Sequence, residues 1–252
     1  MTAARQGLLL PAIAAALAFA VLVGLGTWQL ERRQWKHALI DVLTQRVNAA
    51  PTALPAKQRW GELTAENDEF RRVMFHAELA PNEQALVFTV GSRLRPDVSG
   101  PGYWVFAPAR LADGGAVVVN RGFVPADRLD VLEHVRQRGE GAAATAIIGY
   151  LRWPEARGWF TPRDEPARNV WYVRDHRLIA AAKGWGEVGP FYVDQEGPAA
   201  PGGLPRPGPL AIALPDDHLQ YALTWYGLAA VLAVVFAVWA HGRLRPGRQD
   251  GG

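Results

Sequence analysis

Two long apolar stretches lie near the ends of the chain. Residues 8–30 and residues 219–240 contain no charged side chain. Each stretch has roughly the 20 residues that a helix needs to cross about 30 Å of hydrocarbon. The pattern therefore predicts two transmembrane helices, over residues 8–30 and 219–240.

The first stretch has an alternative interpretation as a cleaved signal peptide. Residues 16–20 offer small side chains at the spacing of a cleavage site. The apolar run continues beyond them to Leu30, whereas the hydrophobic part of a signal peptide is usually shorter. We therefore favour an uncleaved anchor.

The sequence between the two stretches changes from a helical to a β-type pattern. Apolar side chains recur at helical spacing from Glu31 to about Val47, so the first helix is expected to continue past the apolar stretch. Short runs rich in β-branched and aromatic residues follow, separated by turn-forming residues. They predict a hairpin of 71–79 with 85–90, a hairpin of 102–111 with 116–124, strands at 144–153 and 189–196, and a short helix within 173–184, capped by Asp175 and ended by Gly184.

These elements define the expected fold class. We predict a membrane protein in which two terminal transmembrane α-helices flank a small β-rich α+β domain on the extracytoplasmic (periplasmic) side, over residues 31–196. Residues 197–215 are rich in proline and glycine and are predicted to be a linker back to the membrane. Residues 241–252 are predicted to be a cytoplasmic tail.

The distribution of basic residues predicts the orientation. Arginines follow the second apolar stretch at positions 243, 245 and 248, which places the C-terminus in the cytoplasm by the positive-inside tendency. Two spans then place the N-terminus there as well, so we expect a multi-pass protein of the cell inner membrane with both termini cytoplasmic. Arg32, Arg33 and Lys36 after the first stretch oppose this orientation, but a large domain translocates largely regardless of such charges.

Composition and missing motifs narrow the function. The chain has no cysteine, which excludes disulfides, thiolate metal sites and cysteine nucleophiles. A net charge of only +3, without a basic stripe, argues against a nucleic-acid partner. The sequence has no G-x-S-x-G, P-loop, G-x-G-x-x-G or H-E-x-x-H motif, so we predict no catalytic residue and no enzyme. Among the histidines, His76 is expected to point outward from a strand, and His134 and His176 to lie on the solvated surface.

The polar edges of the two apolar stretches carry the candidate chemistry. Trp28, Arg32 and Trp35 share one helical face by their spacing. The other edge has a second face, formed by His218, Tyr221, Ala222 and Trp225. If the two faces meet, they would suit a flat macrocycle with anionic arms, since imidazole ligates haem iron and arginine pairs with carboxylates. The alternative is an ordinary interfacial belt of aromatic residues.

The same stretches carry a resemblance to a known family. "GTWQLERRQWK" (26–36), "VVNRGFVP" (118–125) and "HLQYALTWY" (218–226) resemble segments of the Surfeit locus protein 1 family of cytochrome c oxidase assembly factors, in particular its bacterial members. "GYLRWPE", "FTPRDEPARNVWYVRD" and "PFYVDQE" are similar to further segments in the same order. The resemblance covers nearly the whole chain.

The resemblance implies a function and a set of residues. Family members assist assembly of haem-copper terminal oxidases, and bacterial members are thought to take haem a from haem A synthase and help deliver it to oxidase subunit I. The resemblance implies that His218 ligates the haem iron, and we expect the neighbouring face residues to complete the haem site. The expected haem-binding set is His218, Tyr221, Trp225, Trp28 and Arg32. The expected partner or structural motif positions are Gly26, Gln29, Trp35, Asn120, Arg121, Gly122 and Pro125, with Arg121 as the partner contact. From the residues alone, Asn120 and Gly122 suit a bulge or turn, since glycine permits a backbone that other residues rarely adopt.

The sequence departs from the family pattern in two places. Asp216 and Asp217 stand where the family often has asparagines, and acidic neighbours favour a protonated imidazole, which is a poorer iron ligand. Phe123 stands where the family usually has tryptophan. Two alternatives to haem delivery remain at this stage. One is a cofactor-free membrane-anchored scaffold that binds an oxidase subunit through its outer domain, at Arg121 or Trp104. The other is a membrane-tethered hydrolase, which the missing motifs disfavour.

Overall fold

The computed structural model describes residues 3–80, 82–137, 144–200, 202–212 and 216–244. The chain divides into two compact units. One comprises Met1–Asp41 and Leu214–Gly252, and the other is Val42–Ala213. The first unit is a pair of helices and the second is a β domain.

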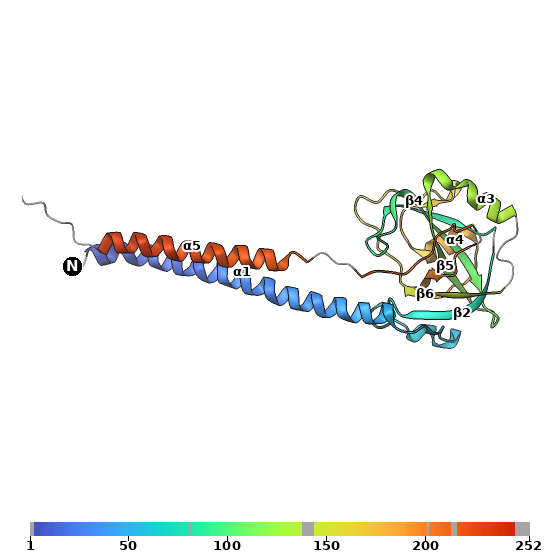
Figure 1. Cartoon of the computed structure of the whole chain (residues 1–252), viewed down its shortest axis with the longest axis horizontal. Helices are drawn as coiled ribbons and strands as arrows, with labels where there is room; N and C mark the ends of the chain where they lie inside the picture. The colour runs from blue at the N-terminus through green and yellow to red at the C-terminus, as the bar shows by residue number, and fades with distance from the viewer. Residues whose placement is uncertain (1–2, 81, 138–143, 201, 213–215, 245–252) are drawn as a thin grey trace, which may run out of the picture. The chain divides into compact units, whose positions relative to one another are not determined.

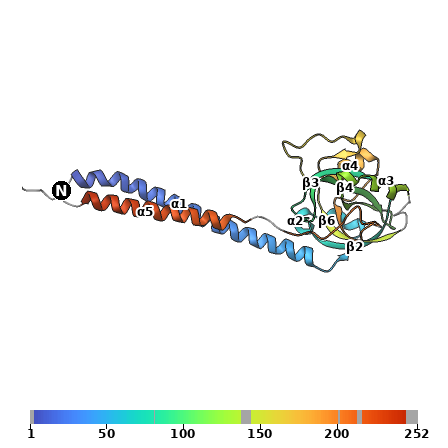
Figure 2. The same cartoon turned by 45° about the horizontal axis from the view of Figure 1, so that its top comes forward.

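The helix pair consists of the two terminal helices. α1 spans Ala3–Asn48 and α5 spans His218–Leu244. They lie side by side in both views (Figures 1 and 2). Both are long and apolar enough to cross a membrane, by length and composition. The helix extends from the first apolar stretch to Asn48 without a break, which confirms the predicted continuation beyond Leu30.

Over its described residues, the β domain contains eight strands and several short helices. The strands are β1 Thr52–Ala53, β2 Arg72–Leu79, β3 Ala85–Gly91, β4 Ser99–Arg110, β5 Ala116–Pro125, β6 Thr145–Arg152, β7 Val170–Trp171 and β8 Tyr192–Gly197. The α-helices are α2 Ala65–Asp68, α3 Asp130–Gln137 and α4 His176–Lys183, and the 3₁₀ turns are η1 Lys57–Glu62, η2 Ala126–Arg128 and η3 Pro166–Arg168.

The sheet is mixed and closes on itself. Its order is β1-β2-β6-β8-β5-β4-β3-β7, and an additional pairing joins β2 to β4. The strands β2, β6, β8, β5 and β4 therefore form a closed ring, while β1, β3 and β7 extend it at the margins. Closure removes exposed edges, which is how small β domains avoid uncontrolled strand pairing.

Alternating side chains of the closed strands form the main core. Val73, Phe75, Ala77 and Leu79 of β2 are buried, and the residues between them are exposed. They pack with buried side chains of β4, β5, β6 and β8 and with Trp60 of η1. A second core forms where Ile179 and Ala180 of α4 pack on buried side chains of β3, β4, β5 and β8 that do not belong to the main core. Leu132 of α3 packs on Val105 and Val124 in a smaller cluster, so both α3 and α4 contribute buried side chains against the closed sheet.

The structure confirms the local sequence predictions and corrects one that depends on long-range pairing. β4 and β5 form the predicted hairpin around residues 111–115, and β6, β8 and α4 lie where expected. The Asp175 side chain caps α4 by accepting from the amides of Arg177 and Leu178, and Gly184 ends it in the left-handed conformation. The hairpin predicted for 71–79 with 85–90 is wrong, because β2 pairs with β6 and β3 pairs with β4. His76 is exposed as predicted.

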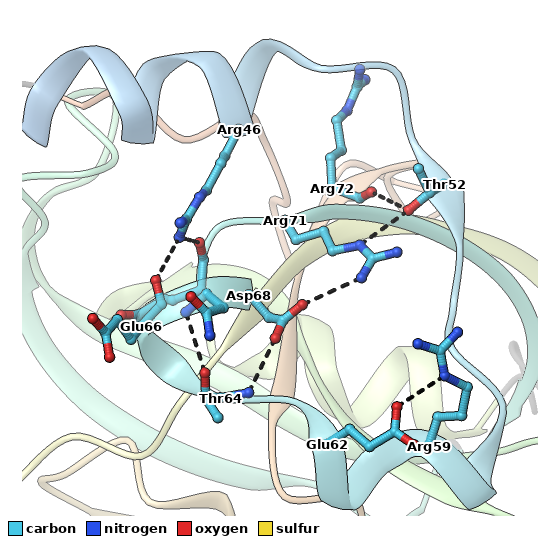
Figure 3. A network of polar contacts seen from close by, with 11 residues as sticks. Arg46, Thr52, Arg59, Glu62, Thr64, Glu66, Asp68, Arg71 and Arg72 are labelled. Carbon is cyan, nitrogen blue, oxygen red and sulfur yellow. Dashed lines mark hydrogen bonds and ion pairs between the residues drawn. The ribbon is translucent and has the colours of Figure 1, made fainter.

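The last turn of α1 belongs to the β domain and contacts it through apolar packing and hydrogen bonds. Val47 packs in a small core with Phe70, Tyr150 and Leu210. The Arg46 guanidinium donates to the carbonyl oxygens of Glu66 and Glu69, at 3.1 and 3.2 Å (Figure 3). Figure 3 also shows the Asp68 carboxylate between the Thr64 amide and the Arg71 guanidinium, which stabilises the turn that Arg46 contacts.

The segment predicted to be a linker is packed against the sheet over part of its length. Residues 198–200 and 202–212 contain no helix or strand, as its composition indicates. Arg206 nevertheless forms an antiparallel bridge with Phe123 of β5, and Leu210 is buried. Residues 213–215 lie outside the described residues. We refer to residues 205–210 as the strap.

His176 is buried, so the prediction that it lies on the solvated surface is wrong. It starts α4 and is 0% exposed, with Nε2 2.9 Å from the Gly189 carbonyl oxygen and the ring against Tyr192. Burial lowers the pKa of His176 from 6.5 to about 4. The side chain of His134 lies outside the described residues.

This burial predicts a pH dependence of folding. The unfolded chain binds a proton at His176 below about pH 6.5, whereas the folded domain does not until about pH 4, so stability falls as the pH drops through this window. The loss from this one group is about 2 kcal/mol between pH 7.5 and pH 5. We expect His176→Gln, which keeps a donor for Gly189 but does not titrate, to show a correspondingly flatter profile. Urea unfolding of the full chain in detergent measures this difference, and parallel pH profiles of variant and wild type would contradict it.

Candidate functional site

The start of α5 is stabilised by an acidic residue that also reaches α1. The Asp216 carboxylate accepts from the His218 backbone amide at 3.2 Å. Its other oxygen lies 3.2 Å from Arg33 Nε and 2.5 Å from His37 Nε2. The hydrogen bond with His37 is the main cause that lowers the pKa of Asp216 below its usual range. Asp216 thus connects the N-terminal end of α5 to the polar part of α1.

The His218 side chain makes a direct contact with α1. Its Nδ1 lies 2.8 Å from Oε1 of Gln29. Because an amide oxygen only accepts hydrogen bonds, this contact requires the proton on Nδ1. It leaves Nε2 of the neutral ring with a lone pair. The Asp216 carboxylate contacts the His218 backbone amide and the side chains of Arg33 and His37, so its side-chain partners lie on α1.

Small residues allow the two helices to approach closely. A Cβ at Gly26 would lie 2.9 Å from the Tyr226 ring, and the Thr27 and Tyr226 hydroxyl oxygens are 3.0 Å apart. Ala222 and Ala229 are buried on the facing side of α5. Small residues at such positions are typical of helix pairs in membranes. The helix pair is therefore held by the packing of the Tyr226 ring on Gly26 and by polar contacts around His218.

The faces that meet differ from those expected from the sequence. Gly26, Gln29, Arg33 and His37 follow one another at helical spacing on α1, and their contacts with α5 define the facing side. On α5 the corresponding residues are His218, Ala222, Tyr226 and Ala229.

The aromatic residues predicted to line a haem site lie mostly away from this contact. Trp28 and Trp35 are each 54% exposed and Tyr221 is 56% exposed, while Trp225 is half-buried. Arg32 is exposed, with its guanidinium 4.0 Å from the centre of the Trp35 ring. The face of Trp28, Arg32 and Trp35, which the spacing suggested as a possible counterpart of the His218 face, is therefore not the face that contacts it. The α1 residue that reaches His218 is Gln29, and spacing alone did not distinguish it.

The second motif, residues 120–125, forms a bulge in β5. Asn120 pairs with Phe106 of β4 and Phe123 pairs with Trp104, so Arg121 and Gly122 together oppose one residue. Gly122 has a φ of +123°, which favours glycine, and its amide donates to the Asn120 side chain at 3.2 Å. The prediction of a bulge or turn at Asn120 and Gly122 is confirmed. Pro125 is half-buried at the end of β5.

The bulge holds the strap. Backbone hydrogen bonds join Phe123 and Arg206 in both directions, at 3.0 and 2.8 Å. A Cβ at Gly122 would lie 2.3 Å from the carbonyl carbon and oxygen of Arg206. From the other side, the buried Arg95 guanidinium donates to the Pro207 carbonyl oxygen at 3.2 Å and pairs with Asp97. Gly122 thus gives the strap the space it occupies.

A buried polar network lies beside the bulge. Asn120 Nδ2 donates to Asp194 at 2.7 Å, and Arg152 donates to the other oxygen of Asp194 at 3.0 Å and to Glu69 at 3.1 Å. Removing either partner of such a buried ion pair would destabilise the domain, since it leaves the other charge buried and unpaired. Asp194 and Arg152 were not singled out by the sequence, because their partners come from distant strands.

Two residues expected to contact a partner protein are buried. Arg121 is 7% exposed and Trp104 is 4% exposed, with Trp104 packed edge-on against Phe123. The structure therefore does not support Arg121 or Trp104 as a docking surface. The motif at 120–125 organises the domain interior and the strap.

Together these features define a class of protein: a closed β domain inserted between two long apolar helices that pair through small residues, with an imidazole–amide contact at one end of the pairing. A model of the SURF1 family matches residues 16–230. The chain is 36% identical to Surfeit locus protein 1 of Mus musculus over 230 residues, which cover 86% of this chain and 71% of that protein.

Other relatives match to a similar extent. Surfeit locus protein 1 of Homo sapiens is 34% identical over 224 residues, covering 84% of this chain and 72% of the human protein. A SURF1-like protein of Monosiga brevicollis is 32% identical over 238 residues, covering 92% and 87%. The chain belongs to the SURF1 family.

Proposed function

We propose that this chain is a membrane-anchored assembly factor for a haem-copper terminal oxidase, which binds haem a through His218 and helps deliver it to oxidase subunit I. Haem A synthase is the proposed source of the haem. Family membership and the motif resemblance support the role in oxidase assembly. The observation that carries haem binding is the contact between His218 and Gln29.

The residues at the helix pair fit an axial haem ligand. Metal-binding histidines usually donate their other ring N–H to an acceptor, which fixes the tautomer and the ring orientation. Gln29 is such an acceptor for Nδ1, so Nε2 is the atom that would ligate. Haem iron, when bound, accepts an imidazole nitrogen as an axial ligand. The exposed rings of Trp28, Trp35 and Tyr221 offer apolar surface beside this end of the pair.

The proposed location is the cell inner membrane. α1 and α5 would cross the bilayer, with both termini in the cytoplasm and the β domain on the outer side. Their lengths and hydropathy support crossing, and the arginines after residue 242 support the orientation. The lipid bilayer is then a partner of both helices.

Complementation of a deletion strain tests the assembly role. In a host whose oxidase carries haem a, deletion of this chain is expected to lower the haem a content of purified subunit I, and the wild-type gene to restore it. Gln29→Leu keeps His218 but removes its acceptor. Loss of such an outer hydrogen-bond partner weakens metal binding about 10- to 100-fold. We therefore expect this variant to restore less haem a to subunit I than the wild-type gene does.

Two outcomes of this experiment would contradict the proposal. Unchanged haem a content after deletion would remove the role in oxidase assembly. Full restoration by Gln29→Leu, with the deletion itself defective, would support the cofactor-free scaffold instead. Gln34→Leu, on an exposed position of the same helix, is the matched control and is expected to restore fully.

A further inference from the structure

Two adjacent aromatic side chains on the β domain are completely exposed. Trp159 is 101% exposed and Phe160 is 100% exposed, the highest values among the large apolar side chains of the described residues. They lie in the segment between β6 and α4, which projects from the domain as a loop (Figure 2). Large apolar side chains exposed together usually mark a surface that binds something apolar.

The loop that carries them is held by polar contacts. The Arg157 guanidinium binds the Asp164 carboxylate and the Pro162 carbonyl oxygen across the turn. The Gly158 amide donates to the Thr161 hydroxyl at 3.1 Å, and the Thr161 amide donates to the Gly158 carbonyl at 3.2 Å. We call residues 157–164 the aromatic turn.

The base of the aromatic turn is fixed as well. Glu165 and Val170 exchange backbone hydrogen bonds of 2.8 and 3.2 Å. The Tyr172 amide donates to Asp164 at 2.9 Å, and the Tyr172 hydroxyl donates to Glu165 at 3.0 Å. Trp159 and Phe160 are therefore exposed at the tip of an ordered turn.

We propose that the aromatic turn is a membrane-binding element, in which Trp159 and Phe160 insert into the headgroup region of a lipid bilayer. The inference rests on the proposed membrane location of the chain. The hydrogen bonds of Gly158, Thr161 and Pro162 hold the two rings at the tip of the turn. Insertion into the headgroup region leaves the backbone of the tip in contact with water, which only the hydrocarbon core excludes. Tryptophan is enriched at this depth of the bilayer.

Charge and connectivity favour lipid over a protein groove. The aromatic turn carries two arginines and one aspartate, and because Arg157 pairs with Asp164 the exposed Arg163 is the cation that would face an anionic lipid surface. The domain is also joined by the chain at both ends to helices of membrane-spanning length. Such a tether raises the effective concentration of a nearby bilayer, so even a small apolar tip suffices for stable contact.

Fluorescence quenching in vesicles tests the proposal, and the absence of native cysteine makes each introduced label unique. The full chain is reconstituted into vesicles of phosphatidylcholine and phosphatidylglycerol, with and without lipids that carry a doxyl quencher near the headgroup. An environment-sensitive fluorophore is attached at Phe160→Cys, at Leu223→Cys on the exposed side of α5, or at Glu78→Cys on the exposed side of β2.

We expect quenching at positions 160 and 223 but not at 78, and loss of quenching at 160 when Trp159 is also changed to serine. Quenching at 223 without quenching at 160 would overturn the membrane-binding role of the turn and leave the membrane location intact. Absence of quenching at 223 would overturn the membrane location, and this inference with it. A spectral shift at 160 without lipid quenching would indicate contact with a second protein copy and would also overturn the proposal.

Discussion

Replacement of Gly122 by alanine is expected to destabilise the β domain by about 3–5 kcal/mol, a large part of the stability of a typical domain. Two costs combine at this position. Gly122 has a φ of +123°, which is strained for any other residue. The added Cβ would also lie 2.3 Å from backbone atoms of Arg206, and backbone cannot rotate away as a flexible side chain does. The strap would have to leave β5, breaking both backbone hydrogen bonds between Phe123 and Arg206.

A matched glycine separates the two costs. Gly114 in the β4–β5 turn has a φ of +80°, but nothing lies within 4 Å of the position that a Cβ would take there. Gly114→Ala is therefore expected to show the conformational cost alone, about 1 kcal/mol. Urea unfolding of the full chain in detergent, followed by tryptophan fluorescence, compares the two variants. Equal midpoints for Gly122→Ala and Gly114→Ala would contradict the role assigned to the strap.

The contrast between these glycines shows what the sequence could predict. Gly122 was expected to serve a bulge, because that requirement is local. Its close contact with Arg206 could not be foreseen, since the two residues are distant in the chain and residues 197–215 have the composition of a linker. The same distinction explains why α4 and the β4–β5 hairpin were predicted correctly, while β2 and β3 were paired with each other wrongly.

The buried polar residues show a second limit. His176 lies in a charged stretch, which suggested a solvated position, yet it starts a helix whose inner face packs on the sheet. Arg121 was expected to contact a partner protein and is buried. Residue type indicates average exposure, but a closed sheet determines burial through register, which depends on pairing with distant strands.

At the helix pair, the sequence correctly indicated His218 but not the α1 residue that contacts it. His218 was singled out as a polar group at the start of an apolar helix, and it does face α1. The large aromatic residues drew attention to Trp28 and Trp35, but close helix packing selects small residues. Gly26, Ala222 and Ala229 are the small residues on the facing sides, and their size was not used to predict which sides would meet.

Replacement of His218 by alanine is expected to abolish haem binding, which is the second large effect. The variant removes the only ring nitrogen assigned to the iron and leaves Gln29 without its partner. The helix pair is expected to survive, because Gly26, Tyr226, Ala222 and Ala229 still pack. His241→Ala, at the other end of α5, is the matched control, since it removes an exposed imidazole from the same helix without touching the His218–Gln29 contact.

The measurement that tests the central claim most directly is the absorbance spectrum of the purified full chain after co-expression with haem A synthase. We predict a Soret band from haem a bound to wild type and to His241→Ala, and its loss in His218→Ala. A band of unchanged position and intensity in His218→Ala, or no haem on the wild-type chain, would contradict the proposal that His218 holds haem a.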